Sequence, residues 1–220
     1  MDNTCGACGQ VSGGTNPYEA DSDACTHCGA ALPVTLSTPS GASEWVINTT
    51  DDDVRIAVDD GPPPSLDVWV RGARKFHHTI ATAATQRNDV DARVSMRFLA
   101  CASGVSAGLA IRDSALGGYA LHIDSDGAFS VVLYAANGAS ASFMVPWTKH
   151  EAVRRGLGVT NEVRMDMRGV HLRGWVNGAL VCSLYDARCV AGVARVQLDP
   201  SGTDTHVVVT HVAIRDADPR

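Results

Sequence analysis

The sequence predicts an all-β protein in which an antiparallel two-sheet sandwich follows a small cysteine-rich module. About a dozen short, strand-like runs cover the chain beyond residue 53, and turn signals such as DSDG, AANG and DPSG separate them. No segment has the periodicity of a helix longer than a turn or two, although KHEAVRRG (149–156) could form a short one. Many short strands joined by regular turns are typical of sandwiches and jelly rolls.

The cysteine-rich module is predicted from the spacing of Cys5, Cys8, Cys25 and Cys28, which is C-x2-C-x16-C-x2-C. Two residues between thiolates let one tight turn present both sulfurs to a metal, and four thiolates complete the tetrahedral shell of a structural Zn²⁺. The segment has too few large apolar side chains to fold without that metal. Two alternatives are open: His27 replaces one cysteine ligand, or the four cysteines form disulfides in an exported protein.

The chain divides into a zinc ribbon (1–32), a linker (33–43) and a sandwich domain (44–220). The first part resembles the short N-terminal zinc ribbons of bacterial proteins and carries no Lys or Arg. Pro, Ser, Thr and Gly without hydrophobic periodicity mark the linker. We expect one structural Zn²⁺ and a ribbon that touches protein or caps its neighbour.

Charge and hydropathy exclude several classes of partner. The net charge is −6, and the chain lacks the basic excess that attracts nucleic acid or anionic membranes. No apolar run approaches the roughly 18 residues that span a bilayer. The first residues, MDNTCGAC, lack the features of a secretory signal, and three further cysteines remain unpaired. We therefore expect a cytoplasmic protein.

The predicted strands follow the order of the chain. They are 54–58, 66–70, 78–85, 91–101, 107–113, 118–124, 128–136, 141–147, 161–169, 170–176, 179–185, 191–199 and 206–216.

The order of motifs along these strands resembles the concanavalin A-like, LamG-like jelly roll of bacterial domains described as 3-keto-disaccharide hydrolase-like. The resemblance spans roughly residues 44–216, and one departure is Thr210–His211, where that family has a Phe-Asp pair. The resemblance implies the fold, whereas lectins, hydrolases and interaction modules all share this sandwich. The motif residues are Arg112, Gly118–Tyr119, Asp126–Gly127, Trp147, Asn161, Gly169, Val176–Asn177–Gly178, Asp186 and Gly192.

The sequence offers no catalytic constellation. Glycosidases need two carboxylates across one bond, and no Glu-x-Asp-x-x-Glu motif is present. DSDG (124–127) is predicted to be a hairpin turn rather than a calcium loop. His77 and His78 are adjacent, and His206 and His211 are an odd number of residues apart, so each pair is expected to face opposite ways. We therefore expect no enzyme.

One candidate surface lies on 161–178, where every second residue should face the core. Val163, Met165 and Met167 are the inward set on the first strand. The outward residues could stack a sugar or bind an acidic partner, although an ordinary solvated face is the alternative. Trp147 is a second candidate, predicted in the loop before Arg154–Arg155, although we favour its interpretation as a loop anchor packed on the sandwich edge. The candidate outward residues are Arg164, Arg168, His171, Arg173 and Trp175.

The leading functional expectation is a non-enzymatic, cytoplasmic protein-interaction or structural subunit of a larger assembly, with protein partners. A carbohydrate-binding module is the alternative, because the fold is common among lectins, although only 5% of the residues are aromatic. A glycoside hydrolase is a third and weaker hypothesis. No nucleic acid or membrane partner is expected.

Overall fold

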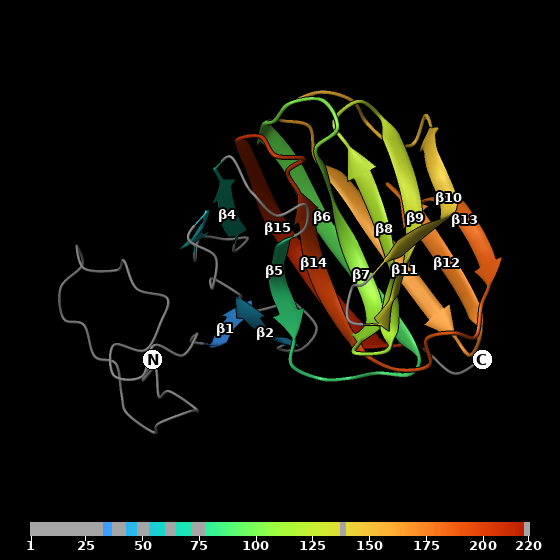
Figure 1. Cartoon of the computed structure of the whole chain (residues 1–220). Helices are drawn as coiled ribbons and strands as arrows, with labels where there is room; N and C mark the ends of the chain where they lie inside the picture. The colour runs from blue at the N-terminus through green and yellow to red at the C-terminus, as the bar shows by residue number, and fades with distance from the viewer. Residues whose placement is uncertain are drawn as a thin grey trace, which may run out of the picture.

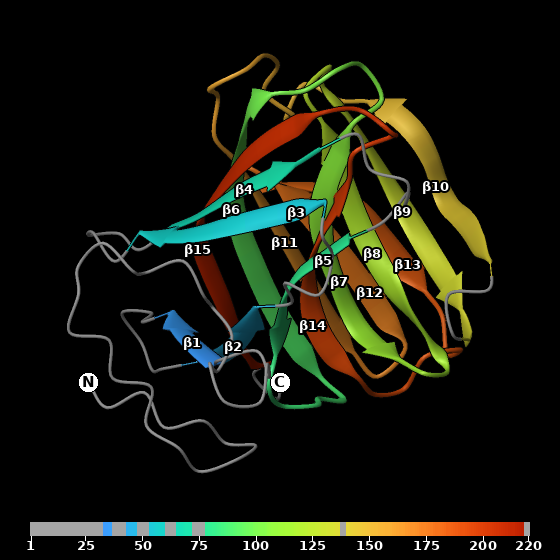
Figure 2. The ribbon, with the colours of Figure 1, turned by 60° about the vertical axis from the view of Figure 1, so that its left-hand side comes forward.

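The residues that the computed structural model describes form fifteen β-strands in two antiparallel sheets. The structure describes residues 33–36, 43–47, 53–59, 65–71, 78–136 and 140–217. Figure 1 shows one sheet toward the viewer and the other behind it, and Figure 2 shows the same two layers from the side of β3 and β4.

The nearer sheet has eight strands. Their order is β1 (Pro33–Leu36), β2 (Ser43–Ile47), β5 (His78–Ala83), β14 (Val193–Asp199), β7 (Ser106–Ser114), β8 (Gly117–Asp124), β9 (Ala128–Ala135) and β10 (Ala141–Lys149).

The second sheet has seven strands, and β6 and β15 lie near its centre. Their order is β13 (Ala179–Tyr185), β12 (His171–Val176), β11 (Asn161–Arg168), β6 (Val90–Ala100), β15 (Thr205–Asp216), β4 (Ser65–Val70) and β3 (Val54–Asp59).

The core lies between the sheets and is built by strict alternation along the strands. Val163, Met165 and Met167 on β11 are fully buried, which confirms the expected inward set. On β12 the inward position 174 is a glycine, and a Cβ there would lie 3.0 Å from Leu121 Cδ2 of the opposite sheet. The missing side chain at Gly174 thus lets Leu121 approach the backbone of β12.

The all-β, two-sheet antiparallel sandwich predicted from the sequence is confirmed, and a strand covers each of the predicted runs. The sequence analysis missed β1 and β2, which lie at the predicted linker and just beyond it, and which pair with each other and extend the eight-stranded sheet at β5. Pro33 begins β1 at the sheet edge, where its missing N–H breaks no ladder.

Residues 149–156 form a turn rather than the short helix that was considered. The buried Asn161 side chain fixes this turn, because it accepts from the Arg154 N–H at 2.9 Å and donates to the Arg154 carbonyl at 3.0 Å. Asn177 also donates to Asn161 Oδ1 and to the Ala152 carbonyl. In the described part of the chain no helix is long and apolar enough to cross a membrane.

Several motif residues of the LamG-like resemblance tie one end of the sandwich together. Tyr119 donates its hydroxyl proton to Asp186 Oδ1 at 2.6 Å and accepts the Cys189 N–H at 3.1 Å. Arg112 is buried and donates to the carbonyls of Asn88 and Cys189. These residues therefore serve the fold.

Candidate functional site

Seven arginines point away from the core on the outer face of the seven-stranded sheet. We call this surface the arginine face. The pairing of the strands places these side chains on the same side of the sheet, and they come from β3, β15, β6, β11 and β12. The seven are Arg55, Arg93, Arg97, Arg164, Arg168, Arg173 and Arg215.

Asp91 on β6 organises one group of these arginines. Its side chain is 3% exposed. Arg164 donates to both of its carboxylate oxygens, at 2.8 and 2.9 Å, and Arg215 donates twice to Oδ2, at 2.8 and 2.6 Å. Burial by itself would raise the pKa of Asp91, but the hydrogen bonds from Arg164 and Arg215 outweigh it and lower the pKa below its ordinary value.

Asp166 on β11 organises the second group and is completely buried. Arg173 donates to both of its oxygens, at 2.9 and 2.7 Å, and Arg168 donates to Oδ2 at 3.1 Å. Two carboxylates thus hold four of the arginines in place, and two-point bonds of this kind fix the orientation of a guanidinium group.

Trp175 on β12 lies among these arginines. The Arg164 guanidinium carbon is 4.7 Å from the centroid of the indole ring, and that of Arg173 is 5.3 Å away. Both are cation–π distances. The indole is partly exposed.

His171 and Tyr185 extend this surface toward the sheet edge. Their rings stack with centroids 4.4 Å apart, and His171 Nε2 lies 2.8 Å from Ser183 Oγ. Tyr185 is 74% exposed, so its outer ring face is open to solvent.

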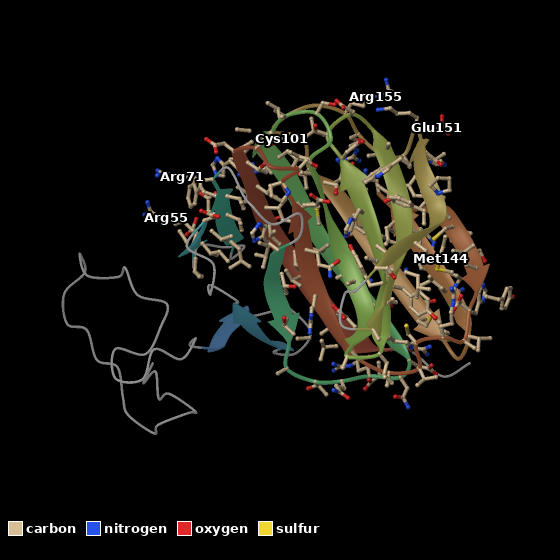
Figure 3. All side chains as sticks on the ribbon, viewed as in Figure 1. Arg55, Arg71, Cys101, Met144, Glu151 and Arg155 are labelled. Carbon is tan, nitrogen blue, oxygen red and sulfur yellow. The ribbon has the colours of Figure 1, made fainter. Side chains whose placement is uncertain are left out.

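A second aromatic group lies at the opposite end of the arginine face. Trp69 on β4 stacks on His206 with ring centroids 4.6 Å apart, and His206 Nε2 hydrogen-bonds to Asp67. The Arg55 guanidinium carbon lies 5.7 Å from the Trp69 ring centroid. Figure 3 shows Arg55 and Arg71 projecting outward from this edge of the sandwich.

His206 and His211 both lie on the arginine face, which corrects the expectation that they face opposite ways. β-Bulges interrupt the pairing of β15 with β6 between His206 and Val207 and between Val209 and His211. The second bulge inserts Thr210 and so restores His211 to the outer side, opposite Ser95.

Trp147 is separate from the other candidate residues. It lies on strand β10 at the edge of the eight-stranded sheet, not in a loop, and is 42% exposed. The structure therefore brings together Arg164, Arg168, His171, Arg173 and Trp175 but not Trp147. The sequence analysis missed Arg93, Arg97, Trp69 and Asp91 of the arginine face, since only strand pairing makes them neighbours of the predicted residues. Alternation puts Asp166 on the same face of its strand as Arg164, but its role in holding arginines was not predicted.

The outer face of the eight-stranded sheet is closed at its centre. Ala110 and Ala120 are completely buried there, and His122 and Gln197 are buried and lie 3.2 Å apart. Desolvation lowers the pKa of His122, which keeps its ring neutral. The same face also carries Arg195, which pairs with Asp113 at 3.1 Å, and the partly exposed Tyr134, so polar side chains flank the buried centre.

No group of three or more metal-ligating side chains occurs within the described ranges. The predicted zinc ligands Cys5, Cys8, Cys25 and Cys28 lie outside those ranges. Asp124, in the DSDG turn, accepts the N–H groups of Asp126 and Ala128 at 3.0 and 2.7 Å, as expected of a hairpin turn.

The sequence matches no protein family and no curated protein. Its fold is similar to the carbohydrate-binding module CBM66 from Bacillus subtilis, with 12% identity, a TM-score of 0.55 and coverage of 77% of this chain and 99% of that one. It is similar to the Bacillus licheniformis β-glucanase at 9% identity, with a TM-score of 0.53 and coverage of 81% and 100%. It is also similar to the family 7 alginate lyase A1-II′ at 10% identity, with a TM-score of 0.55 and coverage of 77% and 86%.

These similarities concern the fold, and they place the chain among jelly-roll sandwiches of the concanavalin and carbohydrate-binding-module type. They correct the leading functional expectation. A non-enzymatic protein-interaction subunit was expected, but the similar structures are named for carbohydrate binding or for the cleavage of polysaccharides. That expectation is wrong because a sequence without a catalytic motif says nothing about which surface of a sandwich binds a ligand.

Proposed function

We propose that this chain is a non-catalytic carbohydrate-binding protein whose ligand lies across the arginine face. The observation that carries the proposal is the pair of partly exposed tryptophans, Trp175 and Trp69, each beside an arginine at cation–π distance. The similarity of the fold to a carbohydrate-binding module supports the same function.

The chemistry of this face suits a sugar. An aromatic ring packs against the apolar C–H side of a pyranose, while guanidinium and carboxylate groups bind its hydroxyls. Because Arg164 and Arg173 already hold Trp175, and Asp91 and Asp166 hold those arginines, little side-chain entropy is lost when a ligand binds.

The carboxylates of the arginine face support a binding function rather than hydrolysis. Asp91 and Asp166 are directly opposite on β6 and β11, close enough for a glycosidase pair. Each of them is buried and bound by two arginines. A general acid must hold its proton at the working pH, whereas Arg164 and Arg215 lower the pKa of Asp91 despite its burial.

On the other sheet, Asp124 and Asp199 both lie opposite Ser106 and are therefore two strands, about 10 Å, apart, but each accepts backbone N–H groups of its own turn. Asp113 and Asp199 lie at opposite ends of the β7–β14 pairing. Asp113 is opposite Val193, which is six residues before Asp199 on β14. That separation is about 20 Å, whereas glycosidase carboxylates lie roughly 5–10 Å apart.

A glycan array probed with the wild-type protein, followed by calorimetry on any glycan retained, tests the proposal. We expect Trp175→Ala and Trp69→Ala each to weaken binding about tenfold, and Trp147→Ala, on the other sheet, to bind like the wild type. Incubation with the retained glycan should release no reducing ends. Retention of no glycan, or equal binding by all three variants, contradicts the proposal, and released reducing ends contradict its non-catalytic part.

A further inference from the structure

We propose that the ligand of the arginine face is an anionic polysaccharide, whose carboxylate groups are bound by Arg93 and Arg97. This inference rests on the proposed function and specifies the class of glycan. Arg93 and Arg97 lie on β6, near the centre of the seven-stranded sheet.

Arg93 is a cation without an anion. It lies opposite Arg164 of β11 and Ala213 of β15, and it forms no hydrogen bond or ion pair with any residue that the structure describes. Arg164 is already bound to Asp91, so the two arginines are direct cross-strand neighbours and only Arg164 is paired with a carboxylate. Like charges directly opposite each other destabilise a sheet. An arriving anion would remove that repulsion.

Arg97 is in a similar position, four residues further along β6 on the same face. Its Nε is buried and has no hydrogen-bond partner, and Val208, opposite it on β15, offers only a buried apolar side chain. A donor left unpaired in this way has lost its water without replacement, which is unfavourable in the free protein. The side chain as a whole is partly exposed, so its charge can still reach a ligand.

Among the described residues, no carboxylate of this face forms an ion pair with either of the two arginines. Asp91 and Asp166 are each occupied by two other arginines. Glu162, opposite Ser95, is diagonal to both Arg93 and Arg97 and forms an ion pair with neither of them. Among the described residues, this face carries seven arginines and five carboxylates, in a chain of net charge −6. The five are Asp59, Asp67, Asp91, Glu162 and Asp166.

The arrangement suits an extended chain rather than a single anion. Trp175 and Trp69 lie four strands apart in the sheet. The strand pairing aligns Trp175 with Arg93 of β6 and Trp69 with Ala100 of β6, so the two tryptophans are also seven residues apart along the strand direction. Together these offsets correspond to about 30 Å between the two side chains. Arg93 and Arg97 lie between the two tryptophans. A guanidinium group binds a planar carboxylate through two parallel hydrogen bonds, so a repeated uronate group fits this track.

Polygalacturonate is the probe, and its fully methyl-esterified form is the matched neutral ligand. A neutral β-glucan and a single-stranded DNA of similar length complete the set. Calorimetry uses the full chain at low salt and again at 0.3 M salt, because ionic contacts weaken as salt screens them. The variants are Arg93→Gln and Arg97→Gln. Arg155→Gln is the control, since Figure 3 shows Arg155 at the top of the sandwich, and its side chain lies against Gly127 in the turn between β8 and β9 of the other sheet.

We expect polygalacturonate to bind and its ester to bind at least about tenfold more weakly. Each of Arg93→Gln and Arg97→Gln should lose about tenfold in affinity, as expected when one charged hydrogen-bond pair is removed. Arg155→Gln should bind like the wild type, and circular dichroism with the melting temperature checks that the variants fold.

Three outcomes overturn the inference. Equal binding of the ester or the β-glucan leaves the carbohydrate function intact but shows that the ligand is neutral. Equal binding of the DNA shows attraction to any polyanion. Unchanged affinity in both arginine variants shows that the anion lies elsewhere, whereas no binding of any glycan defeats the proposed function itself.

Discussion

Asp91 and Asp166 lie directly opposite each other on β6 and β11, and both are buried beneath arginine side chains. Two carboxylates at this spacing would repel each other strongly in water-free surroundings. Bidentate bonds from Arg164 and Arg173 offset that repulsion. The pair thus works as an anchor that orders the outer face of the sheet.

Asp91→Asn is expected to destabilise the fold by about 2 kcal/mol at pH 7, because hydrogen bonds to charged groups contribute roughly 1.5–3 kcal/mol and Arg215 is largely solvent-exposed. Urea unfolding measures this loss in the free energy of unfolding, and we expect the m-value to be the same for the variant and the wild type. Asp216→Asn is the matched control: Asp216 pairs with Arg87 but is 83% exposed, so its loss should change stability by less than about 1 kcal/mol.

The difference in stability between the wild type and Asp91→Asn should depend on pH. Because the pKa of Asp91 is lower in the folded state, the unfolded chain takes up its proton first as pH falls. The stability that Asp91 contributes is therefore complete above about pH 5 and disappears as pH falls through the folded-state pKa. The stability difference between wild type and Asp91→Asn should shrink below about pH 4. A constant difference down to pH 3 would contradict this account.

Two glycine variants should differ sharply in stability. A Cβ at Gly108 would lie 2.1 Å from the Leu121 carbonyl oxygen, so Gly108→Ala forces β7 and β8 apart. Gly178 adopts φ +82° in an open turn, so Gly178→Ala carries only the conformational penalty of about 1–2 kcal/mol. Thermal melting should show a modest shift for Gly178→Ala and severe destabilisation or failure to fold for Gly108→Ala. Similar melting temperatures for the two variants would show that β7 and β8 do not approach each other as closely at Gly108 as the structure has them.

Cys182 should resist alkylation in the folded protein. Burial raises the pKa of Cys182 to about 11, so almost none of it is thiolate at pH 8. Iodoacetamide labelling followed by peptide mass spectrometry should show modification at least about tenfold slower than in urea. Cys101, which is only partly buried, provides the internal comparison and should react first. Faster labelling of Cys182 would show that the β12–β13 edge opens readily.

The N-terminal cysteines give a prediction from sequence alone. We expect one Zn²⁺ per chain, held by Cys5, Cys8, Cys25 and Cys28. Native mass spectrometry should show it, and the double variant Cys5→Ser/Cys8→Ser should lose it. Cys101→Ser should keep the metal. A wild-type mass four hydrogens short and without zinc would show two disulfides in place of the site.

The sequence predicted the sandwich well because alternation and turn chemistry are local signals. Asn177 and Gly178 both have positive φ in the predicted hairpin, and each predicted strand run is present. β1 and β2 were missed because Pro33 and the Ser and Thr residues that follow it indicated a linker, whereas β2 pairs with β5 and β1 pairs with β2. Tertiary pairing overrode local composition there.

The candidate site was only partly predictable. Alternation on one hairpin placed Arg164, Arg173 and Trp175 on a common face. Asp91 comes from β6, more than 70 residues earlier, and no local signal connects it to Arg164. The bulge at Thr210 shifted the register of His211, and bulges leave little trace in a single sequence.

The most direct test of the central claim follows the indole N–H signals of the four tryptophans by ¹⁵N NMR during titration with oligogalacturonate. Single Trp→Phe variants assign the four signals. The account predicts that Trp69 and Trp175 shift together with one affinity, while Trp147, on β10 of the other sheet, stays in place. Movement of Trp147 without Trp69 and Trp175, or no movement at all, would contradict it.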